Sequence, residues 1–566
     1  MADSSIDRWL AGGWRGPLLA ALIALAAGLP GLIAMPVLDR DEPRFAQASA
    51  QMLETGDLVS INFQEEPRNK KPVGIHWLQA LSVSALSSVE KRQIWAYRLP
   101  SLVGAMLAAA GCAWGAAAFF GPRGGAIAGA VLGSSFILST EALLATTDAA
   151  LCAAVTWMMA ALARIYAASR GEAVIAGTGT RVLFWAGLAA SLLLKGPIGL
   201  MVAGLTMLAL WVWDRSAAWL KSLGWSWGIA LVLAVCGPWA VAITVATDGG
   251  FWTGAVMGDM ASKLVHGQES HGAPPGLHLL LTLLLLLPAT IFLPAGLVWG
   301  VKQRTQTAAR FAICWLAPSW LVFELAPTKL PHYPLPLYGA LAWLIAGALT
   351  QPIERTPRLV GQGLLWLAVF VLSFAVVAGA YKLGGDRMVQ WAAIAMFPYL
   401  LTWGSAQRAF DERKQLAALA VTCALGVLGH DLLATVLAPK LTPLWVSARL
   451  AKAVKAEDLD PRNGVTPGPI AVDGYEEPSL VFLLGTRTEL GDADDAAAAI
   501  AEGRPAIVEQ GQLAPFEAAL KADDARAQPA AEVKGLDYSK GKPVDLVLYR
   551  SLEAQPLGTK PPETKP

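Results

Sequence analysis

The residues best suited to chemistry lie in a short polar stretch that follows the first apolar segment of the chain. Asp41 and Glu42 stand beside Arg44, and the basic pair Lys70 and Lys71 comes further along the same segment. A carboxylate can act as a general base, and cations can hold an anionic group such as a phosphate. Ionisable groups are costly near lipid and tend to mark sites, so this stretch is the first candidate.

Residues 41–56 are predicted to form an amphipathic helix that lies in the membrane interface. Pro43 falls in the first turn, where proline is tolerated, and Gly56 stands just past the end. The helix dipole favours ionised carboxylates at Asp41 and Glu42, which leaves Asp41 available as a base. The alternative is that both acids only cap the helix. Its apolar side is formed by Phe45, Ala46, Ala48, Ser49, Met52 and Leu53.

The composition is that of a polytopic membrane protein. Of 566 residues, 55% are hydrophobic and only 15% charged, and the mean hydropathy is +0.47. A net charge of +1 gives no electrostatic case for nucleic acid. The first apolar segment, 16–38, is long enough to span a bilayer and is expected to remain as an anchor. The five cysteines lie in apolar stretches without metal spacing and are expected to be core residues.

Hydropathy predicts about thirteen membrane spans, most of roughly 17 to 24 residues. Their predicted bounds are 16–38, 96–119, 124–142, 145–168, 181–194, 197–213, 226–247, 277–300, 309–326, 334–350, 359–381, 388–405 and 414–438. Lysines and arginines are concentrated in every second loop, which places those loops and the N-terminus in the cytoplasm. An odd number of spans then places the C-terminus outside.

This orientation brings chemically capable residues from distant loops to the outer face. They are Asp41, Glu42, Arg44, Arg68, Lys70, Lys71, Asp148, Lys195, His266, Glu269, His271, Lys329 and His332. Unusual groups gathered on one face favour a shared site, and the alternative is that the loops are simply polar.

Cations in the first outer loop, 39–95, and directly after it are expected to hold a lipid phosphate. Lys70, Lys71 and Arg98 are the candidates, with ordinary snorkelling to headgroups as the alternative. Residues 71–88 form a short apolar segment that is expected to be re-entrant or interfacial.

Asp148 lies close to the membrane core and needs a basic partner. Arg44 or Arg98 is expected to supply it, either for catalysis or as a packing ion pair. Lys329 precedes Tyr333 in a proline-rich loop and is expected to contact a phosphate or a sugar hydroxyl. The alternative for that loop is a proline-shaped re-entry into the membrane.

The outer loop 248–276 contains His266, Glu269 and His271, which can in principle ligate a divalent metal. Their spacing matches no strong metal template, so a flexible loop that covers the site is the preferred interpretation.

Residues 441–566 are predicted to form a small α/β domain outside the membrane, separate from the transmembrane domain 1–440. Strands are expected at 469–472, 479–484, 505–508 and 544–549, helices at 492–501 and 515–523, and a disordered tail at 556–566. The domain carries no catalytic motif and is expected to be structural or to face an acceptor.

Several short motifs together resemble a known family. They are Asp41-Glu42-Pro43-Arg44-Phe45, Lys71-Pro72, Arg98-Leu99-Pro100, Thr147-Asp148, Lys195-Gly196-Pro197, His271-Gly272-Ala273-Pro274 and Lys329-Leu330-Pro331-His332-Tyr333. In this order, over residues 1–350, they resemble the polyprenyl-phosphate-dependent glycosyltransferases of family 39. The resemblance is strongest to the bacterial branch that includes lipid A aminoarabinose transferase and protein O-mannosyltransferase-like enzymes.

The resemblance implies a polytopic α-helical C-type glycosyltransferase fold, with about thirteen transmembrane helices and interfacial helices in the first periplasmic loop. It implies a monomer in a bacterial inner membrane, with the active site and C-terminal domain in the periplasm. The donor would be a sugar on a polyprenyl phosphate such as undecaprenyl phosphate. The acceptor would be lipid A, lipopolysaccharide, another glycan or a protein. No other cofactor is firmly implied, and a divalent metal stays open.

The resemblance also implies roles for single residues. Asp41, with Glu42 beside it, would activate the acceptor hydroxyl, and the anomeric configuration would be inverted. The leaving phosphate would be neutralised by basic residues, and other residues would support the site. The basic residues are Arg44, Lys70, Lys71, Arg98, Lys195 and Lys329, and the supporting residues are Asp148, His271, His332 and Tyr333.

The sequence departs from the aminoarabinose transferases at one informative place. Lys70 stands where those enzymes carry an acidic residue before the Lys-Pro pair. A metal site built on that acid is therefore not expected, and the extra lysine favours a neutral or acidic sugar.

Three alternatives remain from the sequence. One is a protein O-glycosyltransferase of the same fold, and another is a transporter or flippase for a lipid-linked substrate. Transporters often show inverted repeats and midplane charges, whereas here the chemistry lies on one face. The third is a lipid-binding scaffold, for which Asp41→Asn would be harmless.

Overall fold

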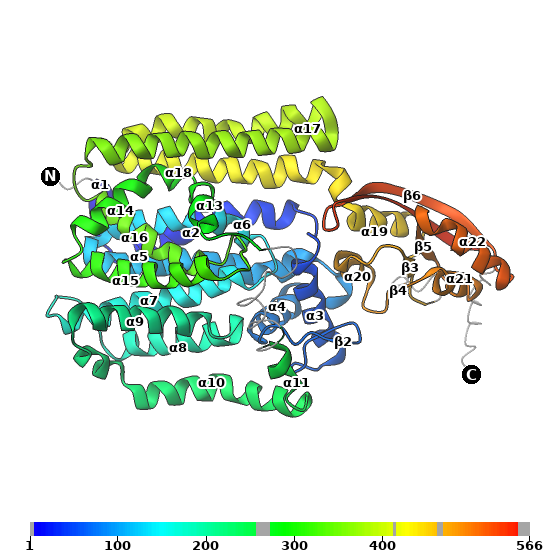
Figure 1. The fold of residues 1–566 in the computed structure, drawn as a ribbon, viewed down its shortest axis with the longest axis horizontal. Coiled ribbons are helices and arrows are strands. Elements are labelled where there is room, and N and C mark those ends of the chain that lie inside the picture. Colours follow the sequence, from blue (N-terminus) through cyan, green and yellow to red (C-terminus); the bar gives the residue numbers. More distant parts are fainter. Residues whose placement is uncertain (1–4, 256–257, 259–271, 411–414, 461–467, 553–566) are drawn as a thin grey trace, which may run out of the picture.

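The computed structural model describes residues 5–255, 258, 272–410, 415–460 and 468–552. The candidate metal ligands His266, Glu269 and His271 and the tail 556–566 lie outside these residues. In Figure 1 the long helices lie side by side in a helical body, with the N-terminus at one end and the C-terminal domain beyond the other.

The body consists of helices whose lengths follow the apolar segments of the sequence. They are α1 (Ser5–Leu10), α2 (Arg15–Ala34), α5 (Ile94–Gly133), α6 (Phe136–Ala142), α7 (Asp148–Ser169), α8 (Thr178–Lys195), α9 (Ile198–Asp214), α10 (Trp225–Ala246), α11 (Gly250–Trp252), α13 (Leu277–Leu285), α14 (Leu293–Lys302), α15 (Thr307–Leu325), α16 (Tyr338–Ala348), α17 (Arg355–Arg408) and α18 (Gln415–Leu432). Its core is rich in alanine along α5 and α7, whose small side chains let the helices pack closely.

Among the described residues, seven helices are long and apolar enough to cross a membrane, or eight if the bent pair Leu277–Leu285 and Ala289–Lys302 is one span. The chain is therefore a multi-pass membrane protein. Two of the helices are each broken at a glycine with positive φ, Gly121 in α5 and Gly385 in α17. Each break falls between two predicted spans. The count of thirteen stays a prediction.

The first loop forms a compact unit next to the helical body. Its elements are α3 (Asp41–Thr55), β1 (Asn62–Phe63), β2 (Glu66–Pro67), α4 (Gly74–Leu86) and the short 3₁₀ helix η1 (Val89–Lys91). The amphipathic helix predicted at 41–56 is α3, and Gly56 ends it in a left-handed conformation with φ of 76°. In Figure 1, α3 and α4 lie between the body and the C-terminal domain.

The C-terminal domain is built on a mixed five-stranded sheet in the order β4-β3-β5-β7-β6. The strands are β3 (Ala471–Asp473), β4 (Glu489–Gly491), β5 (Ala506–Glu509), β6 (Ala527–Asp537) and β7 (Lys542–Ser551), and the helices are α19 (Val446–Ala456), α20 (Pro478–Leu484), α21 (Ala493–Ala501) and α22 (Leu513–Ala522). β3 pairs parallel with β4 and β5, whereas β7 pairs antiparallel with β5 and β6.

The prediction of a strand at 479–484 was wrong, because this segment is the helix α20. Its residues are almost all buried, and a short run buried on every side carries no periodicity that separates strand from helix. Pro478 begins the helix at a position that proline favours. The long strand β6 was missed because its partly exposed, polar sequence lacks an apolar run.

Candidate active site

A cavity of about 210 Å³ opens beside the first loop and brings together three of the predicted basic residues. Lys70, Lys71 and Lys195 line it together with Tyr333. The other walls are mostly apolar and include Leu151, Ile198, Met201, Phe251, Val322 and Phe323. Cations set in apolar walls suit a ligand that carries an anionic head on an apolar chain.

Asp148 and Lys195 form an ion pair at this cavity. Lys195 is the last residue of α8 and Asp148 the first of α7, and the Lys195 Nζ lies 2.5 Å from the Asp148 Oδ1. The prediction that Arg44 or Arg98 partners Asp148 was therefore wrong. The Lys195 ammonium also lies 5.3 Å from the centre of the Tyr333 ring, within the range of a cation–π contact.

His332 joins Asp148 to a second acid, Glu141. Its Nε2 lies 3.8 Å from the Asp148 Oδ2, and its Nδ1 lies 3.5 Å from the Glu141 Oε1. Burial lowers the pKa of His332 to about 4, although the charges of Asp148 and Asp41 act in the opposite direction. The ring is therefore neutral at pH 7, and it ties the loop before η5 (Leu335–Leu337) to α6 and α7.

Glu141, Asp148 and His332 also offer ligand atoms that lie within 4.8 Å of one another, a set that can hold a divalent cation. The Lys195 ammonium already supplies positive charge to Asp148 at 2.5 Å. We therefore assign this cluster to the organisation of Lys195 and derive no step that uses a metal.

Asp41 is exposed at the first position of α3, and its charge reaches His332. It follows Arg40, whose φ of 72° is unusual for a residue with a side chain. Arg44 is half-buried in the same first turn. Asp41 thus combines accessibility with proximity to the acidic and basic cluster, as a general base requires.

Glu42 and Arg98 form a buried pair that braces the start of α3. Arg98 is 0% exposed, and its Nε and Nη2 each lie 2.7 Å from a carboxylate oxygen of Glu42. Arg98 also donates to the carbonyls of Leu32, Met35 and Pro36, while Glu42 accepts from the Leu38 and Ala145 amides. With these contacts, neither side chain is directed to a ligand, so we leave both out of the proposed chemistry.

Lys329 is buried and donates to two backbone carbonyls, those of Ala273 at 2.9 Å and Ala326 at 2.5 Å. It holds the loop after α15 against the segment before α13, and we therefore give it a structural role. Lys71, by contrast, lines the cavity, and its charge reaches Asp148 and His332.

Glu141, a buried carboxylate in α6, was not among the predicted site residues. An acid inside an apolar segment is by itself a sign of function in a membrane protein, and Glu141 could have been predicted on this ground. The polar contacts between α3 and the C-terminal domain were not predicted either, because the sequence offers no local signal for them.

Comparison with known proteins finds a consistent set of relatives. Residues 70–241 match the family described as dolichyl-phosphate-mannose-protein mannosyltransferase. An undecaprenyl phosphate-alpha-4-amino-4-deoxy-L-arabinose arabinosyl transferase from Pseudomonas paraeruginosa is 29% identical over 346 residues, which cover 60% of each chain. The corresponding protein of Erwinia tasmaniensis is 26% identical over 54% of each chain. The chain thus spans less than two thirds of the length of these relatives.

Solved structures show the same fold. ArnT from Cupriavidus metallidurans, solved with bound undecaprenyl phosphate, has a TM-score of 0.76 at 19% identity, over 94% of this chain and 97% of that one. An oligosaccharyltransferase from Archaeoglobus fulgidus has a TM-score of 0.51 at 10% identity, over 92% and 69%. The family match and the relatives make the chain similar to polyprenyl-phosphate-dependent glycosyltransferases, and the solved structures show that it has the fold of ArnT.

Proposed function

We propose that the chain transfers a sugar from a polyprenyl phosphate to an acceptor in the cell envelope, with Asp41 as the general base. The observation that carries this proposal is the cavity lined by Lys70, Lys71 and Lys195 beside the cluster of Asp148 and His332. The exposed Asp41 completes this set.

The cavity supports a donor that arrives from within the bilayer. Its apolar walls suit the prenyl chain next to the phosphate, and its lysines suit the phosphate itself. The relatives named above use undecaprenyl phosphate donors, and ArnT was solved with undecaprenyl phosphate bound. A lipid-linked donor is therefore the substrate class that fits this chain.

In the proposed reaction, the hydroxyl oxygen of the acceptor attacks the anomeric carbon of the sugar, and Asp41 accepts the proton of that hydroxyl. The bond between that carbon and the phosphate oxygen breaks, and the sugar is transferred with inverted configuration. The leaving polyprenyl phosphate gains negative charge, which Lys71 and Lys195 stabilise. Asp148 holds the Lys195 ammonium in place for this task.

The lysines also bear on the choice of sugar. Lys70 is exposed at the cavity next to Lys71, and a cationic sugar would be repelled there. We propose a neutral or acidic sugar, in contrast to the amino sugar named for the relatives. The acceptor we propose is lipid A, lipopolysaccharide or another glycan on the periplasmic face of a bacterial inner membrane.

The test uses the full chain in nanodiscs with three undecaprenyl phosphate donors, which carry aminoarabinose, a neutral hexose or a uronic acid. Mass spectrometry follows liberated undecaprenyl phosphate and the glycosylated acceptor in a lipid A and envelope extract. We expect turnover of the neutral or acidic donor and its loss in Lys71→Ala. Preference for aminoarabinose would overturn the sugar assignment. Movement of intact donor across sealed vesicles without sugar transfer would favour the transporter.

A further inference from the structure

The C-terminal domain contacts the chain on both sides of Asp41. Immediately before Asp41, the backbone N–H of Asp39 donates to the Tyr538 hydroxyl at 2.5 Å, and the Ser479 hydroxyl donates to the Asp39 carboxylate. The Arg40 guanidinium donates to the Ser539 carbonyl, also at 2.5 Å. Asp39 and Arg40 are thus held by residues of the C-terminal domain that lie 440 to 499 positions later in the sequence.

The backbone held by these contacts is strained. Arg40 adopts φ of 72° and ψ of −98°, a conformation that glycine adopts readily and that a residue with a Cβ avoids. Strained conformations of this kind persist only where the surroundings enforce them. Because α3 begins at the next residue, the conformation of Arg40 sets the direction in which the backbone enters the helix at Asp41.

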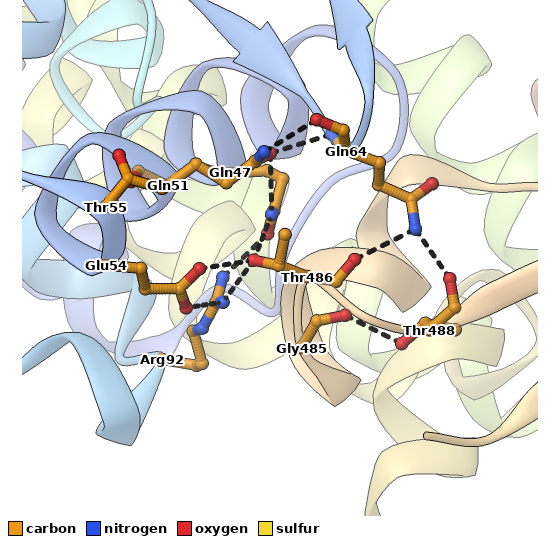
Figure 2. Close-up of polar contacts among 9 residues, drawn as sticks. All are labelled: Gln47, Gln51, Glu54, Thr55, Gln64, Arg92, Gly485, Thr486 and Thr488. Atoms are coloured by element: carbon orange, nitrogen blue, oxygen red, sulfur yellow. Dashed lines mark hydrogen bonds and ion pairs between the residues drawn. The ribbon is translucent and has the colours of Figure 1, made fainter. Parts of the chain in front are cut away.

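A polar network holds the later turns of α3 to the loop after α20. Figure 2 shows Thr486 at its centre. The Thr486 hydroxyl accepts from the Gln47 amide at 2.7 Å and from Arg92 at 2.9 Å, and it donates to the Glu54 carboxylate at 2.6 Å. Gln47 and Glu54 lie on α3, so the network fixes this helix along its length.

Further contacts in Figure 2 extend the network from α3 to β1 and the loop after it. The Gln64 amide donates to the carbonyls of Thr486 at 3.0 Å and Thr488 at 2.6 Å. Gln51 of α3 in turn donates to the Gln64 carbonyl at 2.9 Å. The loop after α20 is therefore bonded to two separate parts of the first outer loop.

An aromatic anchor completes the interface. Phe482 of α20 is 0% exposed and packs in a cluster with Val37, Ala46, Ala50 and Tyr97 of the first loop and its neighbours. Its ring meets the Tyr97 ring edge-on, with centroids 5.2 Å apart. A buried aromatic anchor surrounded by hydrogen bonds is the usual anatomy of a specific interface.

We propose that the C-terminal domain positions the catalytic Asp41, and that Ser479 and Tyr538 are positioning residues which hold the strained turn at Asp39 and Arg40. This inference rests on the proposed function, in which Asp41 is the base. A base that is misplaced by about 1 Å can lose about 10²-fold in rate while the donor still binds in its own cavity.

The first experiment compares the full-length wild type with Tyr538→Phe, Ser479→Ala and the double variant. Tyr549→Phe is the matched control, because Tyr549 lies on β7 in the same domain and packs against Phe516, away from Asp39. The readouts are kcat for the donor, the Kd for undecaprenyl phosphate, and hydrogen exchange of the amides at 36–44. We expect the double variant to lose about tenfold or more in kcat and to exchange faster at 36–44, with an unchanged Kd.

Three results would overturn the positioning role. One is unchanged kcat and unchanged exchange in the double variant. The others are an equal loss of kcat in Tyr549→Phe and a weakened Kd that parallels kcat, because both show general destabilisation of the protein. If the wild type turns over no donor, the proposed function fails by itself. The exchange at 36–44 then still decides whether the C-terminal domain orders this turn.

A second pair of variants separates the strain from the Arg40 side chain. Arg40→Ala and Arg40→Gly both lose the contact to the Ser539 carbonyl, but glycine adopts the observed φ without strain. In the Ser479→Ala background we expect Arg40→Gly to retain more kcat than Arg40→Ala. Equal kcat in the two would show that the strained turn plays no part in positioning Asp41.

Discussion

The Lys195 ammonium lies 2.5 Å from the Asp148 carboxylate and joins the C-terminal end of α8 to the N-terminal end of α7. Both side chains are largely buried, with the Lys195 side chain 12% exposed. A cation at a helix C-terminus and an anion at a helix N-terminus are each favoured by the helix dipole. This pair therefore fixes the position of the Lys195 ammonium at the wall of the lysine-lined cavity.

Loss of this pair should weaken the stabilisation of the leaving phosphate. We expect Lys195→Ala to lower kcat/KM for the sugar donor about 10²-fold, because the variant lacks one of the cations that stabilise the negative charge developing on the phosphate. Asp148→Asn should lower it less, since the ammonium remains but is no longer held. Steady-state kinetics in nanodiscs measures both. Lys302→Ala is a suitable control, because Lys302 forms an exposed ion pair with Glu354. A kcat/KM for the donor that is unchanged in Lys195→Ala would contradict the assignment of Lys195 to the leaving phosphate.

Substitution of Glu42 should lower the folding stability of the protein rather than impair the reaction of the folded protein. Glu42→Gln leaves the fully buried Arg98 guanidinium without its counter-charge. Removal of one partner of a buried ion pair costs about 3 to 5 kcal/mol of folding free energy. We therefore expect a lower melting temperature in detergent and less folded protein in the membrane, with normal donor affinity in the folded fraction. Full stability together with lost turnover would instead place Glu42 in the reaction.

Docking of the C-terminal domain should depend on pH through Asp39. Burial raises the pKa of Asp39 from 3.8 to about 7, and the neighbouring charges of Glu477 and Asp537 act in the same direction against the Ser479 hydrogen bond. Arg40, Tyr475 and Tyr538 are the other charged or titratable groups around it. Between pH 3.8 and about 7, the docked state therefore binds more protons than the undocked state.

The sign follows directly, because a state that binds more protons is favoured at low pH. Docking should be tightest below pH 3.8, weaken as the pH rises, and change no further from this group above about pH 7. Hydrogen exchange at 36–44 across this range measures docking in the wild type and in Asp39→Asn, which stays neutral. We expect the slope with pH to flatten in Asp39→Asn and to persist in Glu66→Gln, an exposed control on β2. An identical slope in all three proteins would exclude Asp39 as its source.

The parts of the site that the sequence predicts correctly depend on local signals. Pro43 lies in the first turn of α3 and Gly56 ends the helix, and Lys70, Lys71 and Lys195, which were expected to lie close together, line one cavity. These features depend on nearby residues or on the membrane itself. They can be predicted without knowledge of how the helices pack.

The pairing of charges was not predictable in the same way. Asp148 lies near several basic residues in any topology with this orientation, and only the packing of α7 on α8 selects Lys195. Arg98 was expected at a phosphate, yet the approach of α3 to α5 places Glu42 against it. The contact of Asp39 with Ser479 spans 440 residues and has no local signature. Such pairs depend on tertiary structure, which sequence patterns do not encode directly.

The most direct test of the central claim is the turnover of a sugar-loaded undecaprenyl phosphate by Asp41→Asn, measured beside its affinity for undecaprenyl phosphate. A general base contributes about 10² to 10⁴-fold, and asparagine keeps the size of the side chain but cannot accept the proton. We expect Asp41→Asn to bind undecaprenyl phosphate with wild-type affinity and to show turnover reduced by that factor. Turnover equal to that of the wild type would contradict the role of Asp41 as the general base and leave it as a helix cap.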